Sequence, residues 1–347
     1  MRAITVVPET AGAVELEELP SPAPTADRLL VQALAMGVCG TDREIIDGQY
    51  GEPPPGEKRL ILGHESLGRV IDAPPGGRFT PGDLVVGIVR RPDPVPCANC
   101  AHGEWDMCQN GRYTESGIKG RHGYGAERYL LEPEFAVRID PSLGRLGVLL
   151  EPASVLAKAW EQIERIGNRA LWTPRRVLIT GAGPVGLLAA MMAVERRLET
   201  HVLDRVTEGP KPQLVRDLGA EYHTSRAAEA CPRPDIVLEC TGAAQLVFDV
   251  IENNAPNGIV CLTGLSSGGR MTKIDLALLN RELVLENDVV FGSVNANRRH
   301  YQLAAESLLR ADRRWLERLI TRRVPLDRWR EAFEHQEGDV KTVIEFE

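Results

Sequence analysis

A glycine-rich turn constrains the fold of this chain more than any other feature. The apolar run Val177–Thr180 leads directly into the hexapeptide Gly-Ala-Gly-Pro-Val-Gly, and a helix-like segment follows. In such a turn the first glycine permits a tight bend, the second lets backbone amides approach a pyrophosphate, and the third lets strand and helix pack closely. The sequence therefore predicts a dinucleotide-binding turn. Its candidate cofactor-binding residues are Gly181, Gly183, Pro184, Val185 and Gly186.

An acidic residue lies at the expected distance beyond this turn. Asp204 comes 18 residues after Gly186, at the end of the next predicted strand. Its carboxylate would accept hydrogen bonds from the adenosine ribose and repel a 2′-phosphate, which favours NAD. Arg205 is either a solvated arginine or a partner for that phosphate, so NADP stays possible. Thr241 is a further candidate cofactor-binding residue.

The pattern of apolar residues divides the chain into two domains. Short β-like runs separated by Gly and Pro fill the first 150 residues, which favours an antiparallel, barrel-like domain. A helix predicted at Pro152–Ile166 is followed by alternating strands and helices, which is typical of a parallel sheet covered on both faces. We expect a catalytic domain of residues 1–152 completed by 298–347, and a doubly wound domain of residues 153–297.

Composition excludes several classes of protein. Of 347 residues, 43% are hydrophobic, and 41 basic against 49 acidic residues give a net charge of −8. A mildly acidic chain is a poor candidate for binding nucleic acid or an anionic membrane. We see no secretory signal, and glycines and Pro184 break the uncharged run Val177–Val194, so we predict a cytoplasmic protein rather than a membrane span. Seven cysteines, an odd number, also fit metal ligands in a reducing compartment better than disulfides.

Four residues of the expected catalytic domain suit a zinc ion. Cys39 lies 25 residues before the pair His64-Glu65, and Glu151 follows much later. Thiolate, imidazole and carboxylate are zinc ligands, and a catalytic zinc lowers the pKa of a bound water or alcohol to about 7. Thr41, two residues after Cys39, is well placed to pass the proton outward. Taken separately, these residues could also be a buried cysteine, a structural histidine and two surface acids.

The motifs around these residues resemble the medium-chain zinc-dependent alcohol dehydrogenases along the whole chain. Within that superfamily the chain is similar to the glucose 1-dehydrogenases of archaea. The matching segments, besides the glycine turn, are 37–42, 63–68, 81–85, 90–92, 120–124, 150–154, 292–295 and 341–346.

This resemblance implies a GroES-like catalytic domain, a Rossmann domain and an enzyme that oxidises C1 of an aldose to the lactone with NAD or NADP. Carried over by position, it places Cys39, His64, Glu65 and Glu151 at the catalytic zinc and Thr41 in the proton relay. It also places Asn295 near the nicotinamide. The residues that it places near the sugar are Glu115, Glu151 and His300.

A second metal site is expected in the lobe around Cys97, Cys100 and Cys108. The wider family has four cysteines in this lobe, and here Asp93 and Pro94 stand where the first is expected. Carboxylate oxygen also binds zinc, so Asp93 is the natural fourth ligand. The alternative is a degenerate lobe with three free thiols.

We therefore expect a zinc-dependent NAD(P)-linked sugar dehydrogenase, with D-glucose as the leading substrate. A polyol or cyclitol dehydrogenase is the alternative among enzymes, and a non-catalytic NADP-binding protein of the same fold is the alternative outside them. An edge strand of the Rossmann sheet near Val289–Phe291 could pair across a two-fold axis, and the family resemblance implies a homodimer or homotetramer.

Overall fold

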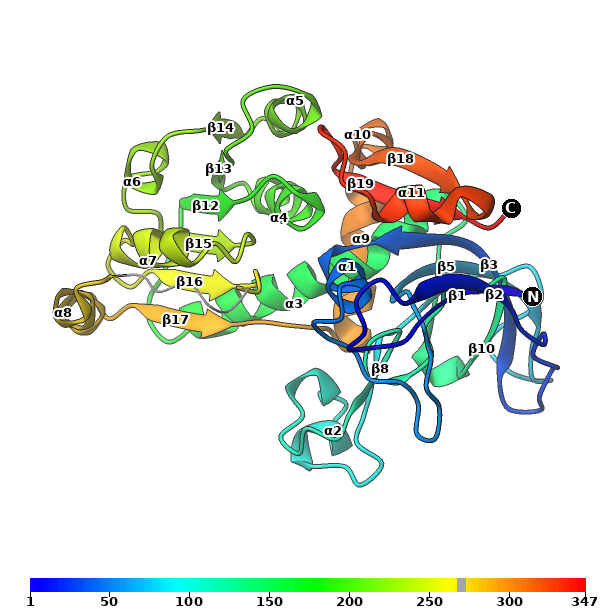
Figure 1. The fold of residues 1–347 in the computed structure, drawn as a ribbon. Coiled ribbons are helices and arrows are strands. Elements are labelled where there is room, and N and C mark those ends of the chain that lie inside the picture. The colour runs from blue at the N-terminus through cyan, green and yellow to red at the C-terminus, as the bar shows by residue number, and fades with distance from the viewer. Residues whose placement is uncertain (267–272) are drawn as a thin grey trace. The chain divides into compact units, whose positions relative to one another are not determined.

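The chain forms two compact units in the computed structural model, which describes residues 1–266 and 273–347. One unit comprises Met1–Ser154 together with Asn295–Glu347, and the other comprises Val155–Val294. Helix α3, Leu150–Gly167, carries the chain from the first unit into the second (Figure 1).

The second unit is built on a six-stranded sheet in which every pairing is parallel, with the order β14-β13-β12-β15-β16-β17. The order reverses between β12 and β15, which makes the switch point at which doubly wound sheets bind ligands. The predicted Rossmann fold is confirmed. Its strands are β12 Arg176–Thr180, β13 Glu199–Leu203, β14 Glu221–His223, β15 Ile236–Glu239, β16 Ile259–Leu262 and β17 Val289–Gly292.

Helices cover both faces of this sheet (Figure 1). One face packs against α6, α7 and α8 through an apolar cluster that includes Leu178, Val237 and Val260. Helix α4 packs on β12 and β13 and is buried along most of its length. Burial on both faces explains why the strands read as nearly continuous apolar runs. The helices are α4 Pro184–Glu195, α5 Pro210–Asp217, α6 Ala227–Ala230, α7 Ala244–Glu252 and α8 Leu276–Glu286.

The first unit contains a seven-stranded sheet, mostly antiparallel, with the path β11-β6-β5-β3-β19-β18 and β10 also paired with β3. The long strand β3 is its centre, and the C-terminal strand β19 lies antiparallel beside it. Residues from both ends of the chain therefore share one sheet. Its strands are β3 Leu29–Val38, β5 Glu65–Asp72, β6 Leu84–Gly87, β10 Arg128–Leu131, β11 Ala136–Arg138, β18 Ile320–Pro325 and β19 Lys341–Glu345.

Two three-stranded sheets complete this unit. Their strands are β1 Arg2–Val6, β2 Val14–Glu18 and β4 Leu60–Ile61, and β7 Arg90–Arg91, β8 Thr114–Ser116 and β9 Gly120–Arg121. Its remaining helices are α1 Gly40–Ile46, α2 Ala98–Ala101, α9 Arg298–Arg310, α10 Arg313–Leu319 and α11 Trp329–Phe333, with short 3-10 turns at 105–107, 133–135, 144–149 and 326–328. In the described part of the chain, no helix is both long and apolar enough to cross a membrane.

Candidate active site

The centre of the candidate site is a close pair of side chains from two neighbouring strand ends of the first unit. Cys39 follows β3 and caps α1, while His64 immediately precedes β5. The Cys39 sulfur lies 3.0 Å from His64 Nε2. Gly63 is required before the histidine, because its φ of +92° is left-handed and a side chain there would collide with Met36.

A buried aspartate behind the histidine is the functional residue that sequence reasoning missed. Asp42 Oδ1 lies 3.4 Å from His64 Nδ1, and Asp42 Oδ2 accepts a hydrogen bond of 2.9 Å from the Cys39 amide. A carboxylate on the far ring nitrogen orients a metal-binding histidine. The sequence could have indicated this residue, because Asp42 is the last residue of the motif 37–42 that contains Cys39.

The charges around this pair favour a cation. Burial opposes a charge on His64, but the Cys39 sulfur and Asp42 outweigh it and raise the pKa of the imidazole well above its ordinary value. Burial would also raise the pKa of Asp42, yet His64 and the Cys39 amide hold it below the ordinary value. A site that stabilises a proton so strongly also suits a metal ion, which competes with protons for the same ligand atoms.

Glu65 reaches the same point from β5 and forms a buried ion pair with Lys341 of β19. Lys341 Nζ also donates a hydrogen bond of 3.0 Å to the Val38 carbonyl. Gly37 makes room for this pair, because a side chain there would overlap the Glu65 carboxylate and the Lys341 stem. The ligand atoms of Cys39, His64 and Glu65 lie within 4.8 Å of one another.

Glu151 lies close to this group but outside it. The carboxylate is in the first turn of α3 and is buried. Burial raises its pKa to about 7, with His64 opposing the rise and Glu65 adding to it. Glu151 is therefore a carboxyl group that can gain or lose a proton near neutral pH.

The donor set fits a zinc ion. Three buried atoms have no hydrogen-bond partner among the described residues: Asp42 Oδ1, His64 Nδ1 and Glu65 Oε2. Their contacts are the ion pairs named above, between Asp42 and His64 and between Glu65 and Lys341. Thiolate, imidazole and carboxylate together match the ligand preferences of zinc. Thr41 lies in the first turn of α1, two residues after Cys39, and is partly exposed.

The three cysteines of the lobe also come together. Their sulfur atoms lie within 4.8 Å of one another at the ends of α2 and the following 3-10 turn. Backbone hydrogen bonds, including one of 3.5 Å from the Gln109 amide, lower the pKa of Cys97 to about 6. Burial raises the pKa of Cys100 to about 11. A Cys97 thiol with a lowered pKa, close to Cys100 and Cys108, favours a thiolate metal site.

Asp93 is not part of that group in the described structure. Its buried carboxylate accepts hydrogen bonds of 2.8 Å from the Val95 amide and 3.1 Å from Arg112 Nε. These contacts hold the pKa of Asp93 below its ordinary value against the effect of burial. A role as fourth ligand would require the side chain to leave Arg112, and it stays a prediction.

Glu115, expected near the sugar, and Asn295, expected near the nicotinamide, contact each other. Glu115 Oε1 accepts hydrogen bonds from Asn295 Nδ2 at 2.6 Å and from Arg90 at 2.9 and 3.1 Å. Asn295 has a left-handed backbone, with φ of +63°. The predicted sugar-contacting and nicotinamide-contacting residues are therefore linked, and Arg90 neutralises the carboxylate.

His300 belongs to a different set of contacts. It is fully buried near the start of α9, where its Nδ1 accepts a hydrogen bond of 3.1 Å from the Asn297 amide and lies 3.9 Å from Asp106 Oδ2. Asn297 also donates to Asp106 at 2.8 Å. In this arrangement His300 caps a helix, and its contact with a sugar stays a prediction.

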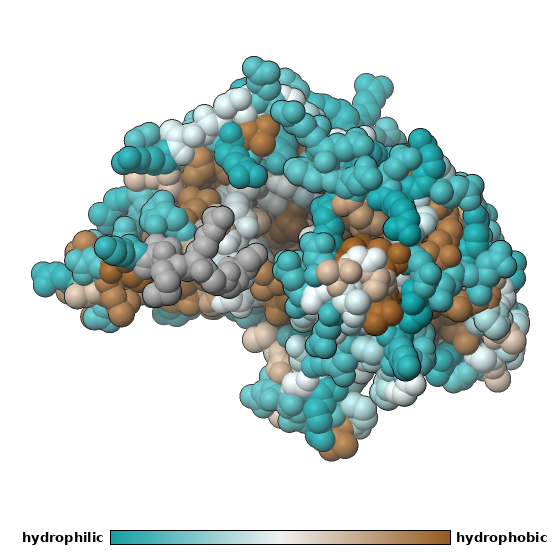
Figure 2. Space-filling view, in the orientation of Figure 1, coloured by the Kyte–Doolittle hydropathy of each residue, from teal (hydrophilic) through white to brown (hydrophobic). Residues whose placement is uncertain are grey.

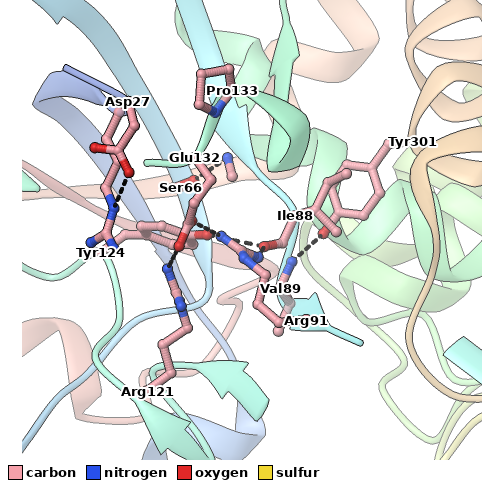
Figure 3. Close-up of polar contacts among 12 residues, drawn as sticks. Asp27, Ser66, Ile88, Val89, Arg91, Arg121, Tyr124, Glu132, Pro133 and Tyr301 are labelled. Atoms are coloured by element: carbon pink, nitrogen blue, oxygen red, sulfur yellow. Dashed lines mark hydrogen bonds and ion pairs between the residues drawn. The ribbon is translucent and has the colours of Figure 1, made fainter. Parts of the chain in front are cut away.

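A polar network ties together the loops that carry the arginine-rich motifs (Figure 3). Glu132 forms ion pairs with Arg91 of β7, at 3.1 Å, and with Arg121 of β9. Arg91 also donates to the Ile88 carbonyl, which accepts a second hydrogen bond of 3.0 Å from the Tyr124 hydroxyl. Burial opposes ionisation of Glu132, but the two guanidinium groups lower its pKa to about 2. These contacts connect the loops that carry the motif residues.

The glycine turn of the second unit opens into a cavity of about 540 Å³. Gly181 has φ of +88°, a side chain at Gly186 would overlap the Gly181 carbonyl, and a side chain at Gly183 would enter open space. Gly181 and Gly186 thus have the tight bend and the close packing that the sequence predicts, while the approach of a pyrophosphate to Gly183 stays a prediction. The described residues that line the cavity do not include Pro184, Val185 or Gly186; they are Gly181, Gly183, Leu203, Asp204, Arg205, Lys211, Thr224, Ser225, Cys240, Thr241, Ala243 and Leu246.

Asp204 has a positively charged neighbour that sequence reasoning missed. Its Oδ2 accepts a hydrogen bond of 2.6 Å from the Ala182 amide and lies 3.5 Å from Lys211 Nζ of α5. Arg205 lines the same cavity. One carboxylate and two cations share this end of the cavity, so the acid alone does not decide the local charge.

Thr241 reaches the cavity from the loop after β15, and a buried glutamate supports that loop. Glu239 Oε1 accepts hydrogen bonds from the Thr241 amide at 2.8 Å and from Thr180 Oγ1 at 3.2 Å. The Thr241 hydroxyl also donates to Glu239. Because Glu239 is buried at the end of a parallel strand, it positions the loop without facing the cavity.

Comparison with known proteins gives the family. The model described as "Glucose dehydrogenase C-terminus" matches residues 144–346, and that of the alcohol dehydrogenase GroES-like domain matches residues 25–141. Glucose 1-dehydrogenase of Methanocella arvoryzae is 40% identical, with 99% of both chains covered. The chain belongs to the glucose dehydrogenase family of zinc-dependent medium-chain dehydrogenases. The predicted family is therefore confirmed.

Two solved structures place the family fold in context. Glucose dehydrogenase of Haloferax mediterranei, solved in complex with NADP, zinc and gluconolactone, is 34% identical, with a TM-score of 0.92 over 100% of this chain and 99% of that one. Galactitol-1-phosphate dehydrogenase of Escherichia coli, with 22% identity, a TM-score of 0.82 and 100% of both chains covered, shares the fold alone. Both predicted domain types, GroES-like and Rossmann, are thus those of the family.

Proposed function

We propose that this chain is a zinc-dependent sugar dehydrogenase that oxidises D-glucose, or a closely related aldose, at C1 to the lactone with hydride transfer to NAD or NADP. The observation that carries the proposal is the convergence of the partly buried Cys39 with the buried His64 and Glu65, with ligand atoms within 4.8 Å of one another. This group of residues occurs in a chain whose relatives from Methanocella arvoryzae and Haloferax mediterranei are glucose dehydrogenases.

The residues of the first unit divide the work at the metal. Cys39 and His64 would hold zinc, with Asp42 fixing the ring of His64 and Glu65 or Glu151 supplying the acid ligand. Zinc, when bound, lowers the pKa of a contacting hydroxyl to about 7. Thr41 would then carry the released proton outward, since a hydroxyl both accepts and donates. Lys341 neutralises Glu65, which leaves Glu151, with its pKa near 7, free to exchange a proton with the sugar or to turn to the metal.

Sugar recognition is assigned to buried polar groups. Glu115, held by Arg90 and Asn295, is a carboxylate with a second oxygen available for a hydroxyl group. A site built from such groups rejects substrates that lack the matching hydroxyls far more strongly than an apolar pocket does. Glu151 and His300 complete the predicted set.

The second unit would bind NAD or NADP in its cavity. The pyrophosphate would approach the amides at Gly183, where a helix begins. Asp204 would accept the ribose hydroxyls of NAD, and Arg205 with Lys211 supplies the charge that a 2′-phosphate needs. We therefore propose that the enzyme favours NAD and also uses NADP.

Assembly and location follow from other features. Figure 2 shows hydrophobic residues at the end of the molecule where α8 lies, and α8 exposes Leu276, Leu278, Val284 and Leu285. The neighbouring strand β17 is an edge of the parallel sheet. A helix with an exposed apolar surface beside an edge strand suits a symmetric contact, so we propose a homodimer or homotetramer. All seven cysteines are free in the structure, in keeping with the reducing cytoplasm.

A substrate panel tests the function. Reduction of NAD and of NADP should be measured with aldoses, polyols, cyclitols and simple alcohols, using wild type and Cys39→Ala. D-glucose or another aldose should give the highest kcat/KM, and Cys39→Ala should lose turnover while still binding the cofactor. A clear preference for polyols or cyclitols would favour the alternative activity, and turnover in the Cys39→Ala protein would refute the zinc site.

A further inference from the structure

A group of acidic and histidine side chains lies on one face of the Rossmann sheet, apart from the residues assigned to zinc. In the parallel pairing of β13 and β14, His201 lies opposite Glu221, and Leu203 lies opposite His223. Side chains two residues apart along a strand share a face, so Glu199, His201, Glu221 and His223 all project to the same side. β14 is the edge strand of the sheet.

Three of these side chains converge on one point. His201 Nδ1 lies 3.0 Å from His223 Nε2, and Glu221 Oε2 lies 3.7 Å from each of these nitrogens. Zinc bonds to imidazole and carboxylate are about 2.0–2.2 Å long, so tetrahedral ligand atoms stand about 3.3–3.5 Å apart. The observed separation of 3.0 Å between the two nitrogens is below that range, and the two separations of 3.7 Å from Glu221 are above it. A shift of a few tenths of an ångström would therefore place all three atoms around one ion.

The remaining carboxylate prepares the buried histidine for such a role. Glu199 Oε1 lies 3.1 Å from His201 Nε2. A carboxylate at that nitrogen keeps the hydrogen there and leaves the lone pair of Nδ1 directed at His223 and Glu221. A hydrogen bond between the two rings would explain the 3.0 Å contact, but it would not explain why the Glu221 carboxylate approaches both nitrogens equally.

The site is also accessible. The His201 side chain is 8% exposed, that of His223 is 21% exposed and that of Glu221 is 67% exposed. A buried ligand therefore anchors the site, while an exposed carboxylate leaves a position open to water. Ions that combine imidazole and carboxylate ligands are of the zinc class, which includes Co²⁺ and Ni²⁺.

We propose that His201, His223 and Glu221 form a second type of metal site, a nitrogen and oxygen site for a zinc-class divalent ion on the nucleotide-binding unit. The ion would fasten edge strand β14 to β13. Thr224 and Ser225, which follow His223, line the nucleotide cavity, and the His223 carbonyl accepts a hydrogen bond of 3.0 Å from the Asp204 amide. Metal binding would therefore stabilise one wall of the cofactor cavity.

Zinc binding to the intact enzyme tests the site. Zn²⁺ should be titrated calorimetrically into purified enzyme that retains its thiolate-bound metal, using wild type, His223→Gln and Glu199→Gln. Wild type should bind one more equivalent than His223→Gln, and Glu199→Gln should weaken that equivalent about 10- to 100-fold, as loss of an outer partner does. The exposed His335 gives the control His335→Gln, which should match wild type. Equal stoichiometry in wild type and His223→Gln would overturn the proposal.

A measurement on wild type alone keeps the proposal testable if a variant fails to fold. One equivalent of Co²⁺ added to the zinc-retaining enzyme should show d–d absorption without a sulfur-to-cobalt charge-transfer band. A thiolate band, or no bound Co²⁺, would overturn the proposal, because the ion would then be at a cysteine site or nowhere.

Discussion

At the scale of single residues, the buried ion pair between Glu65 and Lys341 limits the size of the side chains that fit beside it. Gly37 faces that pair, and a methyl group there would overlap both side chains, whereas Gly40 faces open space. We predict that Gly37→Ala lowers the free energy of unfolding by about 1–3 kcal/mol, the usual cost of overpacking, and reduces activity. Thermal unfolding and kcat/KM measure the two effects. Gly40→Ala is the control, and equal behaviour of the two variants would contradict the assigned packing.

Asp42 is the second residue with a specific expected effect. Its carboxylate lies behind His64, so Asp42→Asn should weaken zinc binding and lower kcat/KM by about 10- to 100-fold without unfolding the protein. Competition with a chelator measures the affinity. Asp47→Asn, at the exposed end of the same helix, should behave as wild type. Unchanged zinc affinity in Asp42→Asn would show that the carboxylate does not orient the ring.

The sequence allowed the zinc-binding motifs to be predicted but not their supporting partners. Cys39 and His64 stand in short motifs that can be read locally. Lys341 meets Glu65 only because β19 lies beside β3, a pairing between residues about 300 positions apart that no local pattern encodes. Asp42 was visible in its motif, but its role depends on the direction in which α1 leaves β3.

At the scale of strands and loops, Glu132 joins β7 to β9 through two arginines (Figure 3). Its pKa of about 2 lies below the ordinary value of 4.5, so the folded state favours the ionised form. The resulting stability is present above pH 4.5 and is lost as the pH falls towards 2. It amounts to at most about 3 kcal/mol, reduced by solvent because the carboxylate is partly exposed.

Acid unfolding of two variants checks this contribution. Glu132→Gln should be less stable than wild type at pH 7, and the difference should shrink as the pH falls from 4.5 to 2. Glu134→Gln, exposed two residues later, should show no such dependence. A constant difference between Glu132→Gln and wild type at all pH values would contradict the ion-pair explanation.

The segment that joins β13 to α5 should set the choice of cofactor. Asp204→Asn removes the charge that repels a 2′-phosphate, so we expect kcat/KM for NADP relative to NAD to rise at least about tenfold, equivalent to about 1.4 kcal/mol. Lys211→Gln should shift the ratio the other way. Steady-state kinetics with both cofactors measure it, and Arg216→Gln on the exposed side of α5 is the control. An unchanged ratio in both variants would place the specificity elsewhere.

At the scale of the whole molecule, the apolar pattern changes near Glu151 from short β-like runs to alternating strands and helices. This change was enough to predict a barrel-like domain followed by a doubly wound domain. Strand–helix alternation predicted the parallel sheet, and the glycine motif predicted a dinucleotide-binding turn after one of its strands. The strand order, with its reversal between β12 and β15, came only from the structure. The first unit was predicted only as barrel-like, because antiparallel strand order depends on long-range pairing. Lys211 was missed for a related reason: it becomes a neighbour of Asp204 only when α5 packs against β14 and α4.

Isotope transfer from labelled glucose tests the central claim most directly. The enzyme should be incubated with D-[1-²H]glucose and, separately, with D-[2-²H]glucose, with NAD or NADP in each case, and the reduced cofactor analysed by mass spectrometry. We expect deuterium from C1 to appear in the reduced nicotinamide, deuterium from C2 to stay in the sugar, and zinc removal to stop the transfer. Cofactor reduction that leaves the C1 deuterium in the sugar product would contradict oxidation at C1.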